Sequence, residues 1–340
     1  MRLIRLIPED TNYNFLGARK IAYVISALLI IASIILVMQR GLNFGIDFTG
    51  GTVIEIRTPV EPNLSDMRTA LNTLGYGAIS IQEFGAPDDL LIRLPQQAGG
   101  DVEKEKEAIA AVRAYLDSTF IGDGDESLVD YRRTEYVGPQ VGKELQIKGI
   151  YAVLFSLLGI LAYIWVRFEW QFGVAAVAAL AHDAIIVIGL FALTQMEFNL
   201  STVAAVLMIA GYSINDTVIV FDRIREMLRK YKKMPLIELF NMSVNSMLTR
   251  TIMTSFTTLL ALTALYMFGG EVIRGFIYAL IFGIVVGTYS SIFVAAPLLL
   301  LMNIRRANLD GSEDIHSSGE DDGYDDAGED DEDLGAPERR

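Results

Sequence analysis

The stretch GYSINDTVIVFDRIR, residues 211–225, places polar and ionisable side chains at the end of a long apolar run. That run, residues 198–221, has Asp216 as its one charged residue. It is long enough to cross a membrane as a helix, where an aspartate costs roughly 2.5–3.5 kcal/mol on insertion scales. Such a carboxylate usually faces the interior of a helix bundle. Asp216 is therefore either a satisfied structural group or a group that binds and releases a proton.

The composition is that of a membrane protein with a soluble part. Of the 340 residues, 52% are hydrophobic, and the mean hydropathy is +0.37. The net charge of −14 is concentrated in residues 305–340, which are predicted to be an acidic, disordered cytoplasmic tail. With no cysteine and two histidines, the chain offers no disulfide framework and no Cys- or His-based metal cluster. We expect no cofactor and no bound metal.

Six segments are long and apolar enough to be membrane-spanning helices. The first follows a basic stretch at residues 1–20 and lacks a small-x-small cleavage site, so we interpret it as an uncleaved span. The predicted spans are residues 21–39, 149–166, 171–196, 198–221, 251–270 and 275–303.

The basic residues predict the orientation of these spans. Six of them crowd the link at residues 223–249, and two more follow the last span. The positive-inside rule then puts the N-terminus, this link and the tail in the cytoplasm. One alternative is that the basic residues of this link have no role other than setting the orientation. Within the link, residues 237–247 are predicted to form an amphipathic helix at the inner surface.

Residues 40–147 are polar, mixed in charge and rich in turn signals, and are predicted to form one periplasmic domain. Their pattern favours the order β-α-β-β-α-β, which is typical of a ferredoxin-like split βαβ sandwich. The expected strands are residues 52–57, 79–84, 89–94 and 131–137, and the expected helices are residues 65–74 and 104–120. The remaining residues, 148–304, hold the other five spans.

Asp216 and Arg250 are predicted to lie at one depth on neighbouring antiparallel helices. Counted from the outer ends of their spans, they lie about 27 and about 28 Å deep. Matched depth predicts a proton-coupling pair. In such a pair, burial favours the protonated carboxyl group, whereas the nearby guanidinium favours the carboxylate. The same count puts both near the inner boundary, where Arg250 could instead reach the headgroups. Only a water-filled inlet or a cytoplasmic extension of the two helices would make the pair central.

Further polar side chains accompany this pair. They either line a hydrated interior or only satisfy backbone carbonyls and permit close packing, and the sequence favours neither. Near the middle of the third span, another group either pairs with a neighbouring helix or joins a proton relay. The side chains that accompany the Asp216–Arg250 pair are Ser213, Asn215, Thr217 and Thr254. The group near the middle of the third span consists of His182 and Asp183.

Four ordered motifs resemble the SecF family, and the similarity covers about residues 15–305. The long acidic tail of this chain, residues 305–340, departs from the family pattern. The motifs are GLNFGIDFTGGT (41–52), VGPQVGKEL (137–145), AHD (181–183) and GYSINDTVIVFDRIRE (211–226). The resemblance implies a non-enzymatic half module of the resistance–nodulation–division (RND) type, with six spans and a soluble domain between the first two.

The resemblance also implies a function and partners. SecF-like proteins are the smaller subunits of the bacterial SecDF complex, which uses the proton-motive force to promote protein translocation across the inner membrane. The implied partners are SecD, the SecYEG channel, YajC, the translocating preprotein and the lipid bilayer, with no nucleic acid. No P-loop, HExxH or Ser/His/Asp set suggests an enzyme.

Residue by residue, the resemblance assigns the intramembrane carboxylate to Asp216 and its arginine to Arg250. It matches the family signature to Asp47, Phe48, Gly50 and Gly51, which we interpret as a structural turn. Two other hypotheses stay open. One is half of a proton-coupled RND-type small-molecule exporter, although such exporters usually carry both halves in one chain. The other is a purely structural stabiliser of the translocon.

Overall fold

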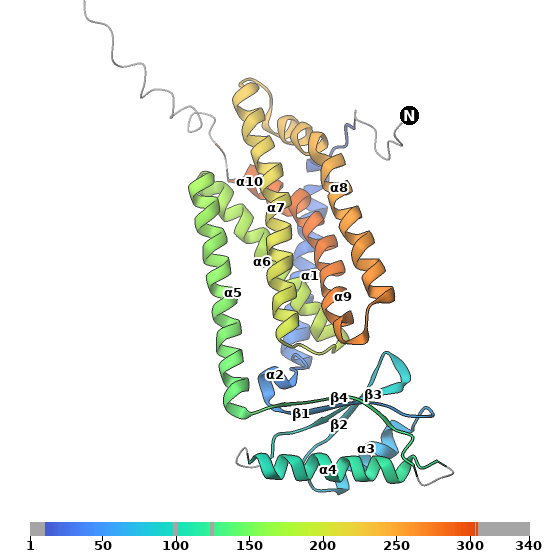
Figure 1. The fold of residues 1–340 in the computed structure, drawn as a ribbon. Helices are drawn as coiled ribbons and strands as arrows, with labels where there is room; N and C mark the ends of the chain where they lie inside the picture. Colours follow the sequence, from blue (N-terminus) through green and yellow to red (C-terminus); the bar gives the residue numbers. More distant parts are fainter. Residues whose placement is uncertain (1–10, 98–100, 123–125, 303, 305–340) are drawn as a thin grey trace, which may run out of the picture.

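The computed structural model describes residues 11–97, 101–122, 126–302 and 304. A bundle of long helices stands on a small domain of sheet and helices (Figure 1). Six helical stretches are long and apolar enough to cross a membrane, which confirms the predicted number of spans. The bundle consists of α1 (Arg19–Arg40), α5 (Pro139–Arg167), α6 (Trp170–Thr194), α7 (Leu200–Lys230), α8 (Leu236–Phe268), α9 (Glu271–Ser290) and α10 (Ala296–Leu301).

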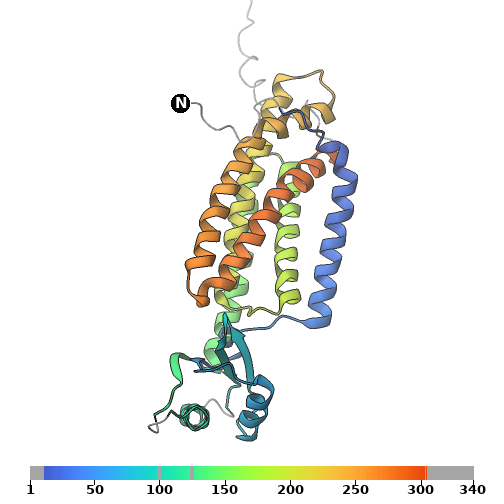
Figure 2. The ribbon, with the colours of Figure 1, turned by 90° about the vertical axis from the view of Figure 1, so that its right-hand side faces the viewer.

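Helices α7 and α8 extend beyond the apolar runs in the sequence. Ile224 and Leu228 are buried one turn apart, so α7 keeps an apolar face up to Lys230 although basic residues cover its other side. Within the predicted link at 223–249, helix occupies all but residues 231–235, so α7 and α8 both extend into it. The predicted surface helix, 237–247, forms the first turns of α8, which cross the end of the bundle (Figure 2).

The last span passes through a π-helical segment, Ser291–Ala295, between α9 and α10. Pro297 lies two residues beyond this segment. A proline lacks the backbone donor and crowds the carbonyl four residues earlier, here that of Phe293. A widened turn accommodates that crowding, and such turns are frequent at functional sites.

The domain below the bundle has the predicted β-α-β-β-α-β order. Its antiparallel sheet has the strand order β2-β3-β1-β4, as in a ferredoxin-like sandwich. Helices α3 and α4 cover the face of the sheet that points away from the bundle (Figure 1). The elements are β1 (Gly51–Arg57), α3 (Leu64–Thr73), β2 (Ser80–Phe84), β3 (Ala86–Leu94), α4 (Val102–Thr119) and β4 (Asp130–Val137).

Strand periodicity explains the core of this domain. Ile54 and Ile56 of β1 point to the same face, since side chains alternate along a strand. They pair with Ile92 and Leu90 of β3 and pack on buried residues of α3 and α4. The sequence did not predict α2 (Ile46–Thr49), a single turn that links α1 to the sheet.

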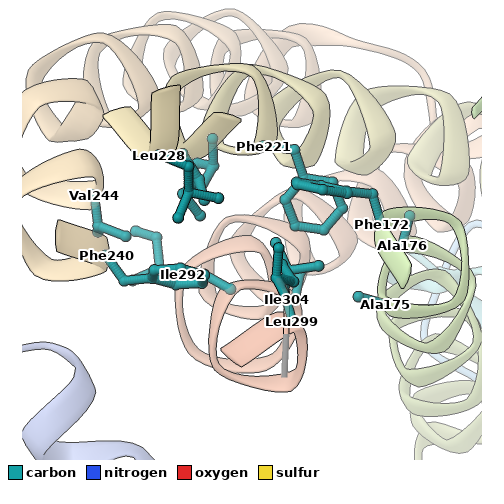
Figure 3. Packing of buried hydrophobic residues seen from close by; sticks show 14 of the residues in the cluster. Phe172, Ala175, Ala176, Phe221, Leu228, Phe240, Val244, Ile292, Leu299 and Ile304 are labelled. Carbon is teal, nitrogen blue, oxygen red and sulfur yellow. The ribbon is translucent and has the colours of Figure 1, made fainter. Parts of the chain in front are cut away.

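Two apolar clusters fill the bundle. The distal cluster lies at the end away from the sheet, where Phe172 and Phe221 meet edge to face at 5.2 Å (Figure 3). The proximal cluster lies toward the sheet and is centred on α6, α7 and α9. Its buried members are Val187, Phe191, Ala205, Ile209, Ala279 and Leu280.

The predicted tail, residues 305–340, and the first ten residues of the predicted N-terminal segment lie outside the described residues.

Candidate functional site

A layer of buried polar side chains separates the two apolar clusters. On α7, Ile209 belongs to the proximal cluster and Val220 to the distal cluster, and the polar residues lie between them. The same succession occurs on α6 and on the last span. We call this set the polar layer. Its members are His182, Asp183, Ser213, Asp216, Thr217, Ser290 and Ser291, none more than 3% exposed.

Two glycines of α9 allow the helices around the polar layer to approach closely. A Cβ on Gly283 would meet the side chain of Ile209, and one on Gly287 would contact Ser213 and Asp183. Small residues four apart are a common device for close packing of membrane helices. The pair brings the last span against α7, so that hydroxyls from both helices reach one carboxylate.

Asp183 is well supplied with hydrogen bonds. Its Oδ2 accepts from Ser213 Oγ at 2.5 Å and from Ser290 Oγ at 2.8 Å. Its Oδ1 lies 2.9 Å from Nδ1 of His182. Asp183 is therefore paired with side chains of two neighbouring helices, and its part in a proton relay stays a prediction.

His182 extends this network to the first span. Its Nε2 lies 3.2 Å from Ser26 Oγ, which lies 3.1 Å from the hydroxyl of Tyr289. Tyr289 in turn donates to the Ala22 carbonyl at 3.0 Å. Four members of this network and of the polar layer were not predicted from the sequence: Ser26, Tyr289, Ser290 and Ser291. In the sequence, Ser26 is one of two serines in the apolar first span, and the other three form a Tyr-Ser-Ser run in the last span.

Asp216 lies in the same layer without such support. Its Oδ2 is buried and has no hydrogen-bond partner among the described residues, and the same holds for the hydroxyl of Tyr212, one turn earlier. Asp216 is sixteen residues after Leu200 and fourteen before Lys230, which is about 24 and about 21 Å. The extension of α7, one of the two conditions that the sequence left open, thus places Asp216 near the middle of its helix instead of at one end.

Arg250 is also far from the ends of its helix, fourteen residues after Leu236 and eighteen before Phe268. It is close enough for its charge to act on Asp216. Its side chain is nevertheless exposed, and no ion pair joins the two residues in the part of the chain that is described. The expected pair is therefore only a proximity here, since matched depth does not fix how a helix is rotated about its axis.

The other predicted polar residues divide into three groups. Thr217 is buried and lies 3.0 Å from Ser291, hydroxyl to hydroxyl. Asn215 is exposed, so it does not line the interior of this chain. Thr254 donates to the Thr251 carbonyl at 2.9 Å, as membrane threonines often do within their own helix.

The signature segment 41–52 and the motif 137–145 pack on each other. Gly50 and Gly51 have φ angles of +71° and +110°, in the region that favours glycine. A Cβ on Gly142, in the first turn of α5, would meet the Gly50 nitrogen and the Phe48 carbonyl oxygen. The predicted turn is present. In addition, Asp47 Oδ2 accepts from the backbone N–H of Leu200 at 2.9 Å, at the start of α7.

The chemistry available in this site is proton exchange. Carboxylates inside membrane bundles pair with other groups or lie on ion and proton paths, and a carboxylate oxygen without a hydrogen-bond partner can take up a proton without breaking a hydrogen bond. Within the described residues, no group of three or more His, Cys, Asp or Glu side chains is placed to hold a metal ion.

A six-span bundle with a ferredoxin-like domain between its first two spans, and a buried aspartate in the fourth, defines an RND-type half module. Comparisons with known proteins narrow this class to one family. A family model described as "Protein export membrane protein SecD/SecF, C-terminal" matches residues 123–305, and one described as "SecD/SecF GG Motif" matches residues 35–58.

Curated relatives agree with this assignment. Protein translocase subunit SecF of Rickettsia conorii is 46% identical over 305 residues, which cover 90% of this chain and 96% of that protein. Its counterpart in Rickettsia bellii is 46% identical over 298 residues, which cover 88% and 96%. The chain belongs to the SecF family of protein translocase subunits.

Solved structures show the same module within a longer chain. SecDF from Thermus thermophilus matches with a TM-score of 0.77 and 36% identity, over 88% of this chain and 40% of that one. SecDF in a super-membrane-facing form matches with a TM-score of 0.65 and 37% identity, over 91% and 41%. The chain thus spans about two fifths of these SecDF chains. The family assignment favours protein export over the small-molecule exporter.

Proposed function

We propose that this chain works with a SecD partner to promote preprotein translocation across the inner membrane at the expense of the proton-motive force. In this proposal Asp216 takes up and releases the proton, and Arg250 acts on it as a nearby charge. The observation that carries the proposal is the buried Oδ2 of Asp216, which has no hydrogen-bond partner among the described residues near the middle of α7.

The two apolar clusters support alternating access to Asp216. The distal cluster begins one turn after Asp216, at Val220 and Phe221, and the proximal cluster ends before Ser213. A continuous water path would have to open one of these clusters. A proton that enters from one side and leaves to the other therefore requires α7 to shift against its neighbours, and this shift can do work.

The arrangement of the bundle supports the orientation. Arg19, Arg229 and Lys230 lie at helix ends remote from the sheet, as Figure 1 shows for α1 and α7. The positive-inside rule puts this end, and with it both chain termini, in the cytoplasm. Residues 40–147, with the sheet, are then periplasmic.

A partner is expected on the exposed side of α7. Gly211 and Asn215 are exposed on the same helix as the buried Asp216, and Arg250 is exposed on α8. A SecD half that covers this side would bury all three beside the carboxylate. The SecYEG channel, YajC and the preprotein are further partners proposed from the family.

The proposal is tested in cells whose only copy carries Asp216→Asn or Arg250→Met, with Asp222→Asn, at an exposed aspartate of the same helix, as the control. We expect the two variants to accumulate normally and to lose preprotein export and proton flux, whereas the control retains both. Proton flux that is intact in the reconstituted Asp216→Asn complex would overturn the role of Asp216. Normal export with Asp216→Asn would make Asp216 a structural group.

A further inference from the structure

The turn between α6 and α7 is paired with the signature segment by backbone hydrogen bonds. The N–H of Gly45 donates to the Phe198 carbonyl at 2.9 Å, and the N–H of Phe198 donates to the Asn43 carbonyl at 2.8 Å. Phe44 and Phe198 are thereby partners in a parallel bridge. The turn that carries the chain from Asp183 to Asp216 is therefore held by the segment that leads into the sheet.

Side chains reinforce both ends of this pairing. Asp47 Oδ2 accepts from the Leu200 N–H at 2.9 Å, and Asn43 Nδ2 donates to the Gln195 carbonyl at 2.9 Å. The Phe198 ring packs against the ring of Phe44, with centroids 5.9 Å apart. Because Leu200 is the first residue of α7, the carboxylate of Asp47 also binds one of the free N–H groups of that helix end.

The sheet itself contributes an arginine. Arg93 of β3 forms an ion pair with Glu197 at 2.8 Å and donates through its other terminal nitrogen to Asn43 Oδ1 at 2.9 Å. The side chains of Arg93 and Glu197 are 12% and 24% exposed, so this pair is less accessible to solvent than the Arg57–Asp88 pair at the opposite end of the sheet, whose side chains are 46% and 32% exposed. Arg93 thus ties β3 both to the turn and to the signature segment.

We propose that this contact, the turn clamp, transmits movement of α7 to the periplasmic domain, with Asp47, Arg93 and Glu197 as its positioning residues. The inference rests on the proposed function of Asp216. The domain is covalently joined to α1 and α5, whereas α7 reaches it through the turn clamp. A shift of α7 that follows proton exchange moves its first residues, and the clamp moves the signature segment and β3 with them.

Charge reversal separates transmission from proton exchange. In the complex with its SecD partner, Arg93→Glu places two carboxylates face to face at the clamp. We expect preprotein export to fall to the level without this subunit, while the protein accumulates and Asp216-dependent proton flux continues. The double variant Arg93→Glu with Glu197→Arg restores opposite charges and should recover much of the export. Arg57→Glu is the control, since it breaks the 2.8 Å Arg57–Asp88 pair at the opposite end of the sheet.

A disulfide provides an independent test, because the chain contains no cysteine. Bridge partners lie about 4.8 Å apart, within the roughly 4.4–6.8 Å that a disulfide spans. Phe44→Cys with Phe198→Cys should support export when oxidised, and should restore export to Arg93→Glu under oxidising conditions but not after reduction.

The outcomes are distinguishable. Normal export by Arg93→Glu, or export and proton flux that fall together, would overturn the clamp as a transmission element, as would a disulfide that fails to rescue. Loss of the role of Asp216 would appear separately, as proton flux unchanged by Asp216→Asn.

Discussion

Asp183 and Asp216 lie in one polar layer and are equally buried, each 1% exposed, yet their surroundings differ. Asp183 is contacted by a histidine and by hydroxyls from α7 and the last span. Asp216 has an oxygen with no hydrogen-bond partner in the described part of the chain. Ser213 sits one turn before Asp216 on the same helix, and it donates to Asp183 instead.

The difference shows that burial alone does not identify a functional carboxylate. A buried polar group with all its partners holds helices together, because its loss leaves several other groups unsatisfied. A buried group without them needs a separate explanation, such as a role in proton exchange. We therefore propose that Asp183 holds the helices of the bundle together and that Asp216 carries the proton.

The largest change in stability is expected for Asp183→Ala. The hydroxyl of Ser213 loses its acceptor, Ser290 and His182 lose one of theirs, and a buried unsatisfied group costs about 1–3 kcal/mol. We expect a loss of about 2–4 kcal/mol in the free energy of unfolding. Thermal unfolding of the purified chain in detergent measures it. Asp216→Ala is the matched variant, and an equal loss there would remove the distinction between the two aspartates.

A smaller loss is expected for Gly287→Leu. A side chain at this position meets Ser213 and Asp183, so α9 must move away from α7. Overpacking of a tight interface typically costs about 1–3 kcal/mol. Gly211→Ala is the control, since a Cβ there meets nothing within 4 Å. Equal thermal stability of Gly287→Leu and the wild type would show that close approach of the helices does not hold the polar layer.

Asp88 shows what an arginine partner does to an exposed carboxylate. The hydrogen bond from Arg57 holds the pKa of Asp88 below its usual value. Because the pKa is lower in the folded state, the contribution to stability is present above the unfolded pKa and is lost as the pH falls through the folded value. We expect NMR titration to show the pKa of Asp88 returning toward its usual value in Arg57→Ala, with Arg113→Ala as a control. A pKa of Asp88 that does not change would exclude Arg57 as the cause.

The smallest effect is expected for Thr254→Val. Its hydroxyl donates to a carbonyl of its own helix, and such bonds add little to stability. We expect a change within about 0.5 kcal/mol and normal export. A large loss of export at normal abundance would place Thr254 in the proton path and extend the functional site onto α8.

Local patterns were sufficient to predict much of the fold. Alternation in residues 52–57 and the turn residues that bound 89–94 placed two strands close to their observed bounds, and the order of elements predicted the sheet topology. The ends of the helices were harder to predict, because each apolar span was taken to end where charged residues begin. Basic residues on one side of α7 do not end the helix while Ile224 and Leu228 continue its buried face. That error displaced Asp216 from the middle of its helix to one end.

Contacts between distant residues account for what the sequence did not predict. The partners of Asp183 come from positions 30 and 107 residues away, which no local period specifies. The same holds for the ion pair of Arg93 with Glu197. Matched depth predicts Arg250 near Asp216, but the rotation of α8 that leaves the arginine exposed depends on packing.

Infrared spectroscopy of the purified complex during a pH titration tests the central claim most directly, since a protonated carboxyl group has its own absorption band. We expect one buried carboxyl to gain this band as the pH falls, and the band to disappear in Asp216→Asn while it persists in Asp183→Asn. A band that persists in Asp216→Asn and disappears in Asp183→Asn would contradict the assignment and transfer the proton to the other aspartate.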